Sequence, residues 1–403
     1  MTPIITFVLP WFGPESAGGA EAQARQLTRS MHAAGAHVEV WTTVGRDSFA
    51  PADYVHYPAG MSTVDGVPVR RFPLSLPYQH GVPAQLATRS FYTPAIWQSI
   101  PEHELRLLAS LVSSEALLEA IATERDQRIF VFMPYPFPTT FWGLILAEER
   151  GVLLPCLHDE PYAYYQSYRW MFANTRRILA NSPAEGAFAE RLYGLTPGQV
   201  VVCGEGIDLS QQGDGERFRH TRGLHGPLLY FAGARPQKNT DMLVRYTREY
   251  WARRGGKLTL MLSGRELPDI PPALGDLVLP LGFLSEQERS DAYAAADLFI
   301  NPSTIESFSI VLMEAWLQGT PALVNADCAV TREAAEQSGG GVAFANFGQY
   351  AAALDLLLGD ATLRQQLGQR GQAWVRANCR WEDVAARTIE AILQLQANTT
   401  PVR

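Results

Sequence analysis

Short apolar runs alternate with longer amphipathic patterns along most of the chain. The first run, IITFVLP at 4–10, is followed by a helical pattern that Gly35 ends, and the run HVEVWTT at 37–43 comes next. Within that pattern, apolar residues such as Leu27 and Met31 fall on one helical face. Because strands that alternate with helices build parallel sheets covered on both faces, the sequence predicts an α/β fold of doubly wound, Rossmann-like layers.

Two such series are present, and a polar segment at 208–226 separates them. This segment contains glycines and has no apolar periodicity, so we predict a linker. A chain of 403 residues with 47% hydrophobic and 18% charged content can bury more than one core. We therefore predict one Rossmann-like domain at 1–207, a second at 227–380 and an amphipathic C-terminal helix within 381–403.

The segment 73–104 fits neither period. It is rich in aromatic residues and proline and reads as an irregular insertion in the first layer. Long irregular stretches inside a compact domain are more often functional than structural filler. We expect this insertion to contribute to function.

Composition and cysteine spacing exclude several classes of function. The 41 acidic and 33 basic side chains give a net charge of −8, which argues against broad electrostatic binding to nucleic acid. The four cysteines are scattered, with neither a CxxC pair nor the His/Cys spacing of a metal site, so we predict no metal and a reducing cytoplasm. No signal peptide and no apolar stretch of roughly 18 residues is present, so we predict a soluble chain with at most peripheral membrane contact.

Two glutamates, Glu306 and Glu314, bracket an apolar run in the sequence TIESFSIVLMEAWLQGTPALV. The residues 310–318 read as a buried helix that Gly319 ends, and PALV then reads as a strand. One interpretation is structural: one glutamate complements the helix dipole and the other faces solvent. The alternative is that both carboxylates serve a ligand.

Two strand-to-helix loops could bind an anion. In GPESAGGAEAQA, Gly18 and Gly19 would let backbone N–H groups approach an anion at a helix N-terminus, although a simple tight turn explains the pair as well. In FAGARPQKNTDML, Arg235 and Lys238 stand just after a strand, where two cations suit a diphosphate. The alternative is a pair of surface charges beside a helix cap.

His158 and Asp159 directly follow the buried run VLLPCL. The histidine could hydrogen-bond a ligand or satisfy a backbone carbonyl, and Asp159 could cap a helix. Neither a serine nucleophile elbow nor a zinc triad accompanies them. These residues alone leave both interpretations open.

Taken together, the motifs resemble the family-four retaining glycosyltransferases of the GT-B fold. The matching elements occur in the family's order: GGAE, HD, ILANSPAEGAFAERLYG, VVVCGEGIDL, GARPQK, GFLSEQERSDAYAAADLFINPS and IESFSIVLMEAWLQGTPALV. The resemblance extends over the whole chain and is most specific from Leu229 to Val324. It implies two Rossmann-like domains that face each other across a cleft and a C-terminal helix that crosses back to the first domain.

The resemblance also implies roles for individual residues. Glu314 matches the glutamate that hydrogen-bonds the nucleotide ribose, and Glu306 matches the one near the donor sugar. In a continuous helix these two would be separated by roughly 12 Å along the axis, about the reach from sugar to ribose. Arg235 and Lys238 match the cations on the diphosphate, and His158 matches the histidine near the transferred sugar.

Further donor contacts follow from the glycine loop and from the segment after Glu306. Gly19, with Gly18 before it, matches the backbone donor of the first loop. Ser307, Phe308 and Ser309 lie where the family usually has G-F-G, so two serines replace glycines whose backbone approaches the donor. Either these serines adopt an ordinary conformation or their hydroxyls take part.

The sequence therefore predicts a metal-independent, retaining hexosyltransferase. Its donor would be a UDP- or GDP-linked sugar with no other cofactor, and its acceptor would be a hydroxyl of a glycan, a lipid-linked or a small molecule in glycan or glycoconjugate biosynthesis. The acceptor would enter from the first domain, past the insertion, at the inner face of the membrane or free in the cytoplasm. The alternatives are a sugar-nucleotide epimerase of the same fold and a non-catalytic module that binds nucleotide sugars.

Overall fold

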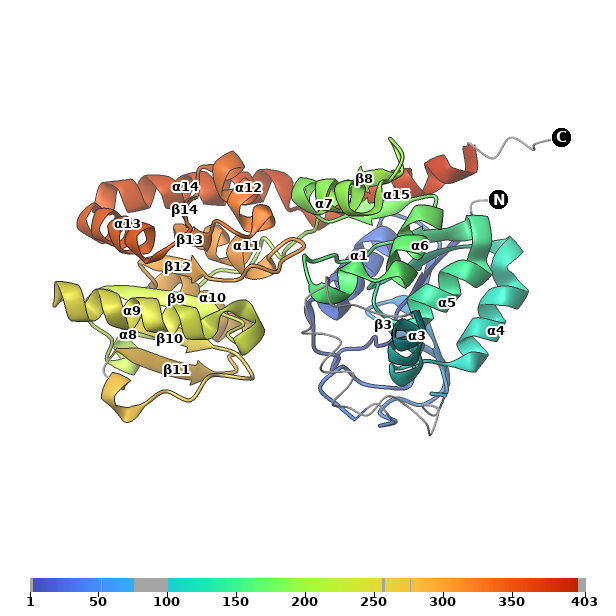
Figure 1. Cartoon of the computed structure of the whole chain (residues 1–403), viewed down its shortest axis with the longest axis horizontal. Helices are drawn as coiled ribbons and strands as arrows, with labels where there is room; N and C mark the ends of the chain where they lie inside the picture. Colours follow the sequence, from blue (N-terminus) through green and yellow to red (C-terminus); the bar gives the residue numbers. More distant parts are fainter. Residues whose placement is uncertain (1–2, 52, 76–100, 256–257, 276, 398–403) are drawn as a thin grey trace. The chain divides into compact units, whose positions relative to one another are not determined.

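The computed structural model describes most of the chain as two compact units. The described residues are 3–51, 53–75, 101–255, 258–275 and 277–397. One unit comprises Met1–Gly206 together with Trp381–Arg403, and the other comprises Ile207–Arg380 (Figure 1). The C-terminal segment therefore belongs to the same unit as the N-terminal strand.

The first unit is built on a sheet of eight strands among its described residues. The strands are β1 (Ile4–Val8), β2 (Val38–Thr43), β3 (Gly60–Val64), β4 (Val67–Phe72), β5 (Arg128–Phe132), β6 (Gly151–Leu153), β7 (Ile178–Ala180) and β8 (Val200–Val202). Their order is β3-β4-β2-β1-β5-β6-β7-β8. β1 pairs in parallel with both β2 and β5, so the order of strands reverses between β1 and β5.

The only antiparallel pair in that sheet, as far as the structure describes it, is the hairpin β3–β4. The turn uses Asp65 and Gly66, both with positive φ (50° and 84°), and Asp-Gly is the dipeptide that favours a two-residue hairpin. This hairpin was not predicted from the sequence. β3 is mostly exposed, so no apolar run marks it.

Helices cover the first sheet, and the last helix of the chain is one of them. They are α1 (Gly19–Ala33), α3 (Pro101–Ser110), α4 (Glu115–Glu124), α5 (Pro138–Ala147), α6 (Gln166–Asn174), α7 (Pro183–Tyr193) and α15 (Trp381–Ala397). α15 lies beside α1 (Figure 1). Val384 and Ile392 of α15 are buried in the same cluster as Leu27 and Met31 of α1, so apolar packing fixes the C-terminal helix to this unit.

The second unit contains a parallel sheet with the strand order β11-β10-β9-β12-β13-β14. The strands are β9 (Leu228–Ala232), β10 (Thr259–Ser263), β11 (Val278–Gly282), β12 (Leu298–Asn301), β13 (Ala322–Asn325) and β14 (Gly341–Phe344). The helices that follow them are α9 (Thr240–Arg254), α10 (Glu286–Ala295), α11 (Ile310–Leu317), α12 (Ala329–Ser338), α13 (Phe347–Gly359) and α14 (Ala361–Asn378). The order reverses between β9 and β12, and ligands in such sheets bind at this switch point, beyond the carboxyl ends of the strands.

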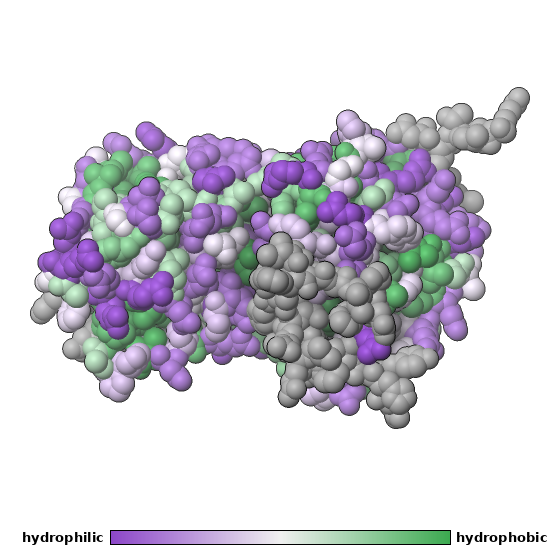
Figure 2. Space-filling model, viewed as in Figure 1, coloured by the Kyte–Doolittle hydropathy of each residue, from purple (hydrophilic) through white to green (hydrophobic). Residues whose placement is uncertain are grey.

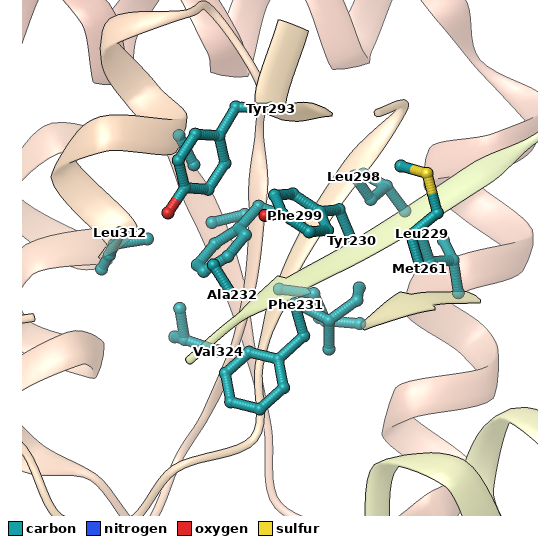
Figure 3. Packing of buried hydrophobic residues seen from close by; sticks show 14 of the residues in the cluster. Leu229, Tyr230, Phe231, Ala232, Met261, Tyr293, Leu298, Phe299, Leu312 and Val324 are labelled. Atoms are coloured by element: carbon teal, nitrogen blue, oxygen red, sulfur yellow. The ribbon is translucent and has the colours of Figure 1, made fainter. Parts of the chain in front are cut away.

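Aromatic residues pack the sheet of the second unit against α10. Figure 3 shows Tyr230, Tyr293 and Phe299 close together in the core. The ring of Tyr293 lies 5.1 Å from that of Tyr230 of β9 and 5.6 Å from that of Phe299 of β12. All three residues are fully buried. This packing fixes α10 relative to the two strands at the switch point.

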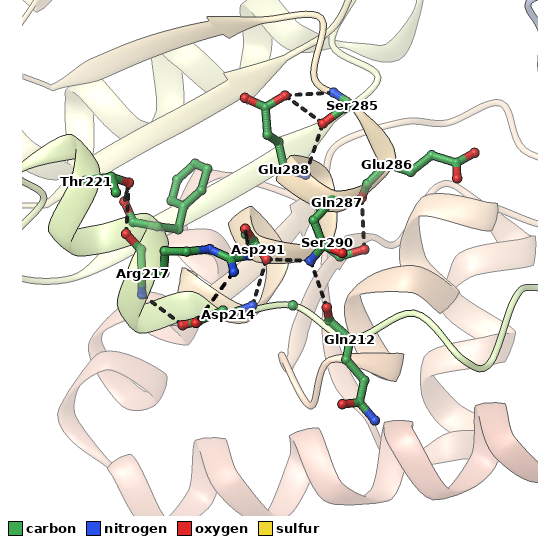
Figure 4. Close-up of polar contacts among 12 residues, drawn as sticks. Gln212, Asp214, Arg217, Thr221, Ser285, Glu286, Gln287, Glu288, Ser290 and Asp291 are labelled. Atoms are coloured by element: carbon green, nitrogen blue, oxygen red, sulfur yellow. Dashed lines mark hydrogen bonds and ion pairs between the residues drawn. The ribbon is translucent and has the colours of Figure 1, made fainter.

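The predicted linker at 208–226 is not a linker. It lies within the second unit and contains α8 (Gly215–Arg222). Asp214 caps the helix by accepting a hydrogen bond from the Arg217 backbone N–H at 2.9 Å, and the buried Phe218 packs into the core. Figure 4 shows how polar contacts fasten α8 to α10: Asp291 accepts from the Asp214 backbone N–H at 2.8 Å and from the Arg217 guanidinium at 2.5 Å. A single buried apolar residue gives no periodicity, which is why the pattern missed this helix.

The insertion predicted at 73–104 falls largely outside the described residues. The structure describes its first residues, 73–75, and its end, where α3 begins at Pro101. Within α3, the buried Glu104 accepts hydrogen bonds from the backbone N–H groups of Gln166 (3.0 Å) and Ser167 (2.8 Å) at the start of α6. The segment's role stays a prediction.

Among the helices described here, none is long and apolar enough to cross a membrane.

Hydrophobic side chains gather on the surface over α5 of the first unit (Figure 2). Large exposed hydrophobic residues in this region of the chain include Trp142 and Ile145 of α5 and Trp170 of α6. The rings of Trp142 and Trp170 both contact Phe141, at 4.9 and 6.3 Å between centroids. These side chains therefore form one apolar area on two neighbouring helices.

Candidate active site

Two loops meet at the switch point of the second unit, one after β9 and the other after β12. Lys238 lies in the first loop and Glu306 in the second. The Lys238 Nζ donates to Glu306 Oε1 at 2.7 Å, and the two side chains are only 16% and 7% exposed. Two residues that the resemblance assigns to the diphosphate and the sugar are thus in direct contact.

The loop after β9 is held by short-range hydrogen bonds. Thr240, the first residue of α9, accepts from the Arg235 backbone N–H at 2.9 Å and donates its hydroxyl to the Arg235 carbonyl at 2.7 Å. Asn239 has a left-handed backbone (φ 57°), and its side chain donates to the Pro302 carbonyl at 3.2 Å. Because Pro302 begins the loop after β12, Asn239 ties the two loops together.

Arg235 differs from Lys238 in its partners. Its Nε is buried and has no hydrogen-bond partner among the described residues. A buried donor without a partner is uncommon in native proteins, and a guanidinium is well shaped to bind phosphate oxygens. Arg235 and Lys238 together can supply two positive charges at one edge of the sheet, one of them neutralised by Glu306.

The two serines after Glu306 behave differently from each other. Ser309 has a left-handed backbone (φ 78°), and its hydroxyl accepts from the Asn301 side chain at 3.0 Å. An ordinary conformation, one of the two alternatives for these serines, therefore does not hold for Ser309, whereas Ser307 does not have a positive φ. Phe308 is buried in the hydrophobic core, so only its backbone is available to a ligand.

Glu314 lies on α11, in contact with α10. Its carboxylate accepts two hydrogen bonds from Arg289, from Nε to Oε2 at 3.1 Å and from Nη2 to Oε1 at 2.8 Å. The hydroxyl of Tyr293 also donates to Oε2, at 2.9 Å. Glu306 precedes α11, which begins at Ile310. The two glutamates therefore do not share a continuous helix, and the separation of about 12 Å deduced from helical rise does not apply.

In the first unit, the glycine pair Gly18 and Gly19 opens α1. Gly18 has φ 149°, and a Cβ there would lie 1.9 Å from Oε2 of Glu21, so the glycine makes room for this carboxylate. Glu21 is 7% exposed. The pKa of Glu21 is raised to about 7, mainly by burial; a backbone hydrogen bond opposes the rise, and the nearby Asp47 adds to it. A carboxyl group that is neutral below pH 7 thus lies at the N-terminus of this helix.

This buried carboxyl group predicts a specific pH dependence of stability. The folded protein holds the Glu21 proton up to about pH 7, whereas the unfolded chain releases it near the ordinary value of 4.5. Stability that depends on this proton is complete below pH 4.5 and is lost as the pH rises to 7. Relative to Glu21→Gln, the wild-type free energy of unfolding should fall by on the order of 3 kcal/mol across this range. Urea unfolding of both proteins from pH 4.5 to 8 measures the difference, and parallel curves would contradict the assignment.

His158 follows β6, and its neighbours hold it in place. Its Nδ1 lies 3.6 Å from Oε1 of Glu160, which also accepts from the Tyr135 hydroxyl at 2.9 Å. The loop itself is held by Glu185 of α7, which accepts from the backbone N–H groups of Leu157 and Asn181, each at 2.5 Å. Burial raises the pKa of Glu185 to about 7, although these two hydrogen bonds and the charge of His158 oppose the rise.

Four residues at these sites were not selected by the sequence analysis: Arg289, Tyr293, Glu160 and Glu185. Glu185 carried a signal, because Ser182 and Glu185 have the spacing of a capping box and Ser182 does cap α7. Arg289 and Tyr293 are four residues apart and so share a face of α10, but nothing local shows that Glu314 is opposite.

The described residues contain no group of three or more His, Cys, Asp or Glu side chains that could hold a metal ion. None of the four cysteines, which all lie in the described part of the chain, forms a disulfide, and Cys203, Cys328 and Cys379 are buried.

Two family models match this chain. The model described as "Glycosyl transferase 4-like domain" matches residues 18–206, and the model described as "Glycosyl transferases group 1" matches residues 226–360. The first match lies in the unit with Gly18, Gly19 and His158, and the second contains Arg235, Lys238, Glu306 and Glu314. Together they cover most of the chain.

Curated relatives match over nearly the full length. "D-inositol 3-phosphate glycosyltransferase 2" of Catenulispora acidiphila is 27% identical and aligns with 95% of this chain and 93% of its own. "D-inositol 3-phosphate glycosyltransferase" of Frankia alni is 28% identical over 88% of this chain and 89% of its own.

Solved structures share the fold at low sequence identity. Sucrose-phosphate synthase from Thermosynechococcus elongatus has a TM-score of 0.73 at 19% identity, covering 98% of this chain and 100% of its own. HepE of Anabaena in complex with UDP has a TM-score of 0.68 at 16% identity, covering 97% and 100%. The predicted fold class, two Rossmann-like α/β domains of the GT-B type, is confirmed by these likenesses.

Proposed function

The chain belongs to the GT-B glycosyltransferases of group 1, and from this premise we propose that it moves a hexosyl unit from a UDP- or GDP-linked sugar to a hydroxyl acceptor, with retention of the anomeric configuration. The observation that carries the proposal is the Lys238–Glu306 pair at the switch point of the second sheet, beside the partly unsatisfied Arg235. A cation for the leaving group and a carboxylate for sugar hydroxyls are needed side by side in sugar transfer.

Charge on the leaving diphosphate is the main obstacle in this reaction. In the proposed step, the bond between the anomeric carbon and the diphosphate oxygen breaks, and a bond to the acceptor oxygen forms on the same face. The acceptor proton passes to the leaving phosphate oxygen. Arg235 and Lys238 stabilise the developing negative charge, and preorganised charges of this kind usually supply the largest share of catalysis. The family resemblance also assigns the backbone N–H groups after Gly18 to the diphosphate.

The sugar and nucleotide would be held by the remaining residues. We assign Glu306 to the sugar hydroxyls, Glu314 to the ribose, and the backbone of 307–309 to the donor. His158 would contact the transferred sugar, because Glu160 and the Glu185-held loop fix its position. These assignments follow the family resemblance, and the pairing of Lys238 with Glu306 supports them.

The acceptor is proposed to bind to the first unit. The names of the curated relatives make D-inositol 3-phosphate the first acceptor to test, followed by other polyol phosphates, glycans and lipid-linked sugars. A place in glycan or glycoconjugate biosynthesis, a cytoplasmic location and peripheral membrane contact remain predictions.

Calorimetric titration with UDP and GDP tests the donor half of the proposal. We expect one of them to bind the wild-type protein and its binding to weaken in Arg235→Ala. The exposed Arg253 of α9, whose side chain is 63% exposed, offers a matched control, and Arg253→Ala should bind like the wild type. Binding of neither diphosphate would contradict the proposed donor class.

We also predict that transfer does not need a divalent metal. The cations of the 235–238 loop take the role that a metal ion has in other transferases. Initial rates should be unchanged, within a factor of about two, after treatment with EDTA. Loss of activity with EDTA that manganese restores would contradict this prediction.

A further inference from the structure

We infer that Arg289 and Tyr293 position the Glu314 carboxylate so that it accepts a hydrogen bond from one ribose hydroxyl rather than from two. The inference rests on the proposed function, because it takes Glu314 as the ribose ligand. To that function it adds two positioning residues and a preference for one of the two ribose hydroxyls, which follows from their geometry. Glu314 was expected to bind the ribose, but its partners in the protein were not foreseen.

The contacts of Glu314 leave little room for a ligand. A carboxylate has about four acceptor positions, two on each oxygen. Tyr293 and Nε of Arg289 occupy both positions of Oε2, at 2.9 and 3.1 Å, and Nη2 of Arg289 occupies one position of Oε1, at 2.8 Å. One position, on Oε1, therefore remains for a ribose hydroxyl.

The two positioning residues are themselves fixed. Tyr293 is buried and its ring contacts those of Tyr230 and Phe299, and Figure 3 shows it at the edge of this cluster on the side of Leu312 of α11. Arg289 lies one turn earlier on α10. Its guanidinium and the carboxylate of Glu314 form a two-bonded pair, which sets the plane of the carboxylate as well as its distance.

The same contacts keep both positioning residues, Arg289 and Tyr293, protonated. Burial lowers the pKa of the Arg289 guanidinium, but the Glu314 carboxylate and Tyr293 outweigh this effect and raise the pKa overall. Burial and the Glu314 charge both raise the pKa of the Tyr293 hydroxyl. Both groups consequently remain hydrogen-bond donors at neutral pH, so neither releases its acceptor position on Glu314.

Deoxy nucleotides test how many ribose hydroxyls donate a hydrogen bond to Glu314. The probes are UDP and GDP, and, for whichever binds, its 2′-deoxy and 3′-deoxy analogues. We expect one analogue to bind about 10-fold or more weakly than the parent diphosphate, as loss of a hydrogen bond to a charged group predicts. The other analogue should bind within about threefold of the parent, since its missing hydroxyl made no bond to the carboxylate.

Variants of the positioning residues separate this role from simple packing. Arg289→Lys keeps the charge but cannot make both bonds, and Tyr293→Phe removes the third donor, so in each the carboxylate regains an acceptor position. The ratio between the dissociation constants of the two analogues should move toward one in both variants. A purely structural role would lower the melting temperature and leave this ratio unchanged.

The matched control is Arg217→Gln on α8. Arg217 pairs with Asp291, which is also on α10, but its side chain is 51% exposed and its ion pairs are with Asp291 and Asp214 rather than with Glu314 (Figure 4). Its loss removes an ion pair from the same helix and should leave the ratio at the wild-type value.

The binding results separate failure of this inference from failure of the proposed donor class. Equal weakening of both analogues, or weakening of neither, in the wild-type protein overturns the inference while parent binding upholds the donor assignment. An unchanged ratio in both Arg289→Lys and Tyr293→Phe also overturns it. If neither UDP nor GDP binds the wild type, the proposed donor class fails, and the inference fails with it.

Discussion

Glu306→Gln is expected to lower the maximal rate of sugar transfer by about 10²-fold, with little increase in the Michaelis constant for the donor. If the carboxylate orients sugar hydroxyls as the glycosidic bond lengthens, its contribution is made mainly in the transition state. The structure adds a reason for the unchanged Michaelis constant. Glu306 pairs with Lys238 at 2.7 Å, so loss of its charge frees the ammonium for the diphosphate.

Steady-state kinetics of this variant should be measured together with its melting temperature. Glu249→Gln is the matched control, because Glu249 is an exposed glutamate of the same unit that pairs with Arg253 four residues later. It should retain wild-type kinetics. If Glu306→Gln loses stability but keeps the wild-type rate, the carboxylate serves only to neutralise Lys238 within the fold.

Arg235→Ala and Lys238→Ala form the second large prediction. Each should lower the rate at limiting donor by about 10-fold to 100-fold, because a hydrogen bond to a charged group contributes about 1.5–3 kcal/mol. The two variants should differ in stability. Lys238→Ala leaves the nearly buried Glu306 without its partner, which is costly, whereas the Nε of Arg235 has no hydrogen-bond partner to leave behind.

A double variant separates the two roles of Lys238, which are to bind the diphosphate and to pair with Glu306. Adding Glu306→Gln to Lys238→Ala removes the unpaired carboxylate, so the melting temperature should recover while the rate does not. Wild-type donor affinity and rate in both single variants would place the diphosphate elsewhere on the protein.

The fold was largely predictable because each layer is a repeated pattern. Buried parallel strands such as β1 and β13 are continuous apolar runs between helices, and they appear at the predicted places. The exposed hairpin strand β3 and the polar helix α8 were not predicted. Both depend on turn and cap residues, Asp65-Gly66 in one and Asp214 in the other, more than on apolar periodicity.

The sequence allowed candidate residues to be selected one by one, but it did not predict the contacts between them. Charged residues that follow a buried strand or flank a buried helix suggest a bound ligand. On this ground we selected Arg235, Lys238, Glu306 and Glu314. That Lys238 pairs with Glu306, 68 positions later, depends on the strand order that puts β9 next to β12. The pairing of Glu314 with Arg289 likewise depends on how α10 packs on α11. Such long-range partners leave no local pattern in one sequence.

The most direct test of the central claim is proton NMR of a reaction that contains the full-length protein, a UDP- or GDP-hexose and D-inositol 3-phosphate. We predict that a new glycoside with the donor's anomeric configuration appears only when both substrates are present, with release of one equivalent of nucleoside diphosphate. The remaining polyol, glycan and lipid-linked acceptors are tested in the same way. An inverted glycoside, an epimerised sugar nucleotide formed without acceptor, or donor binding with no turnover on any acceptor would contradict it.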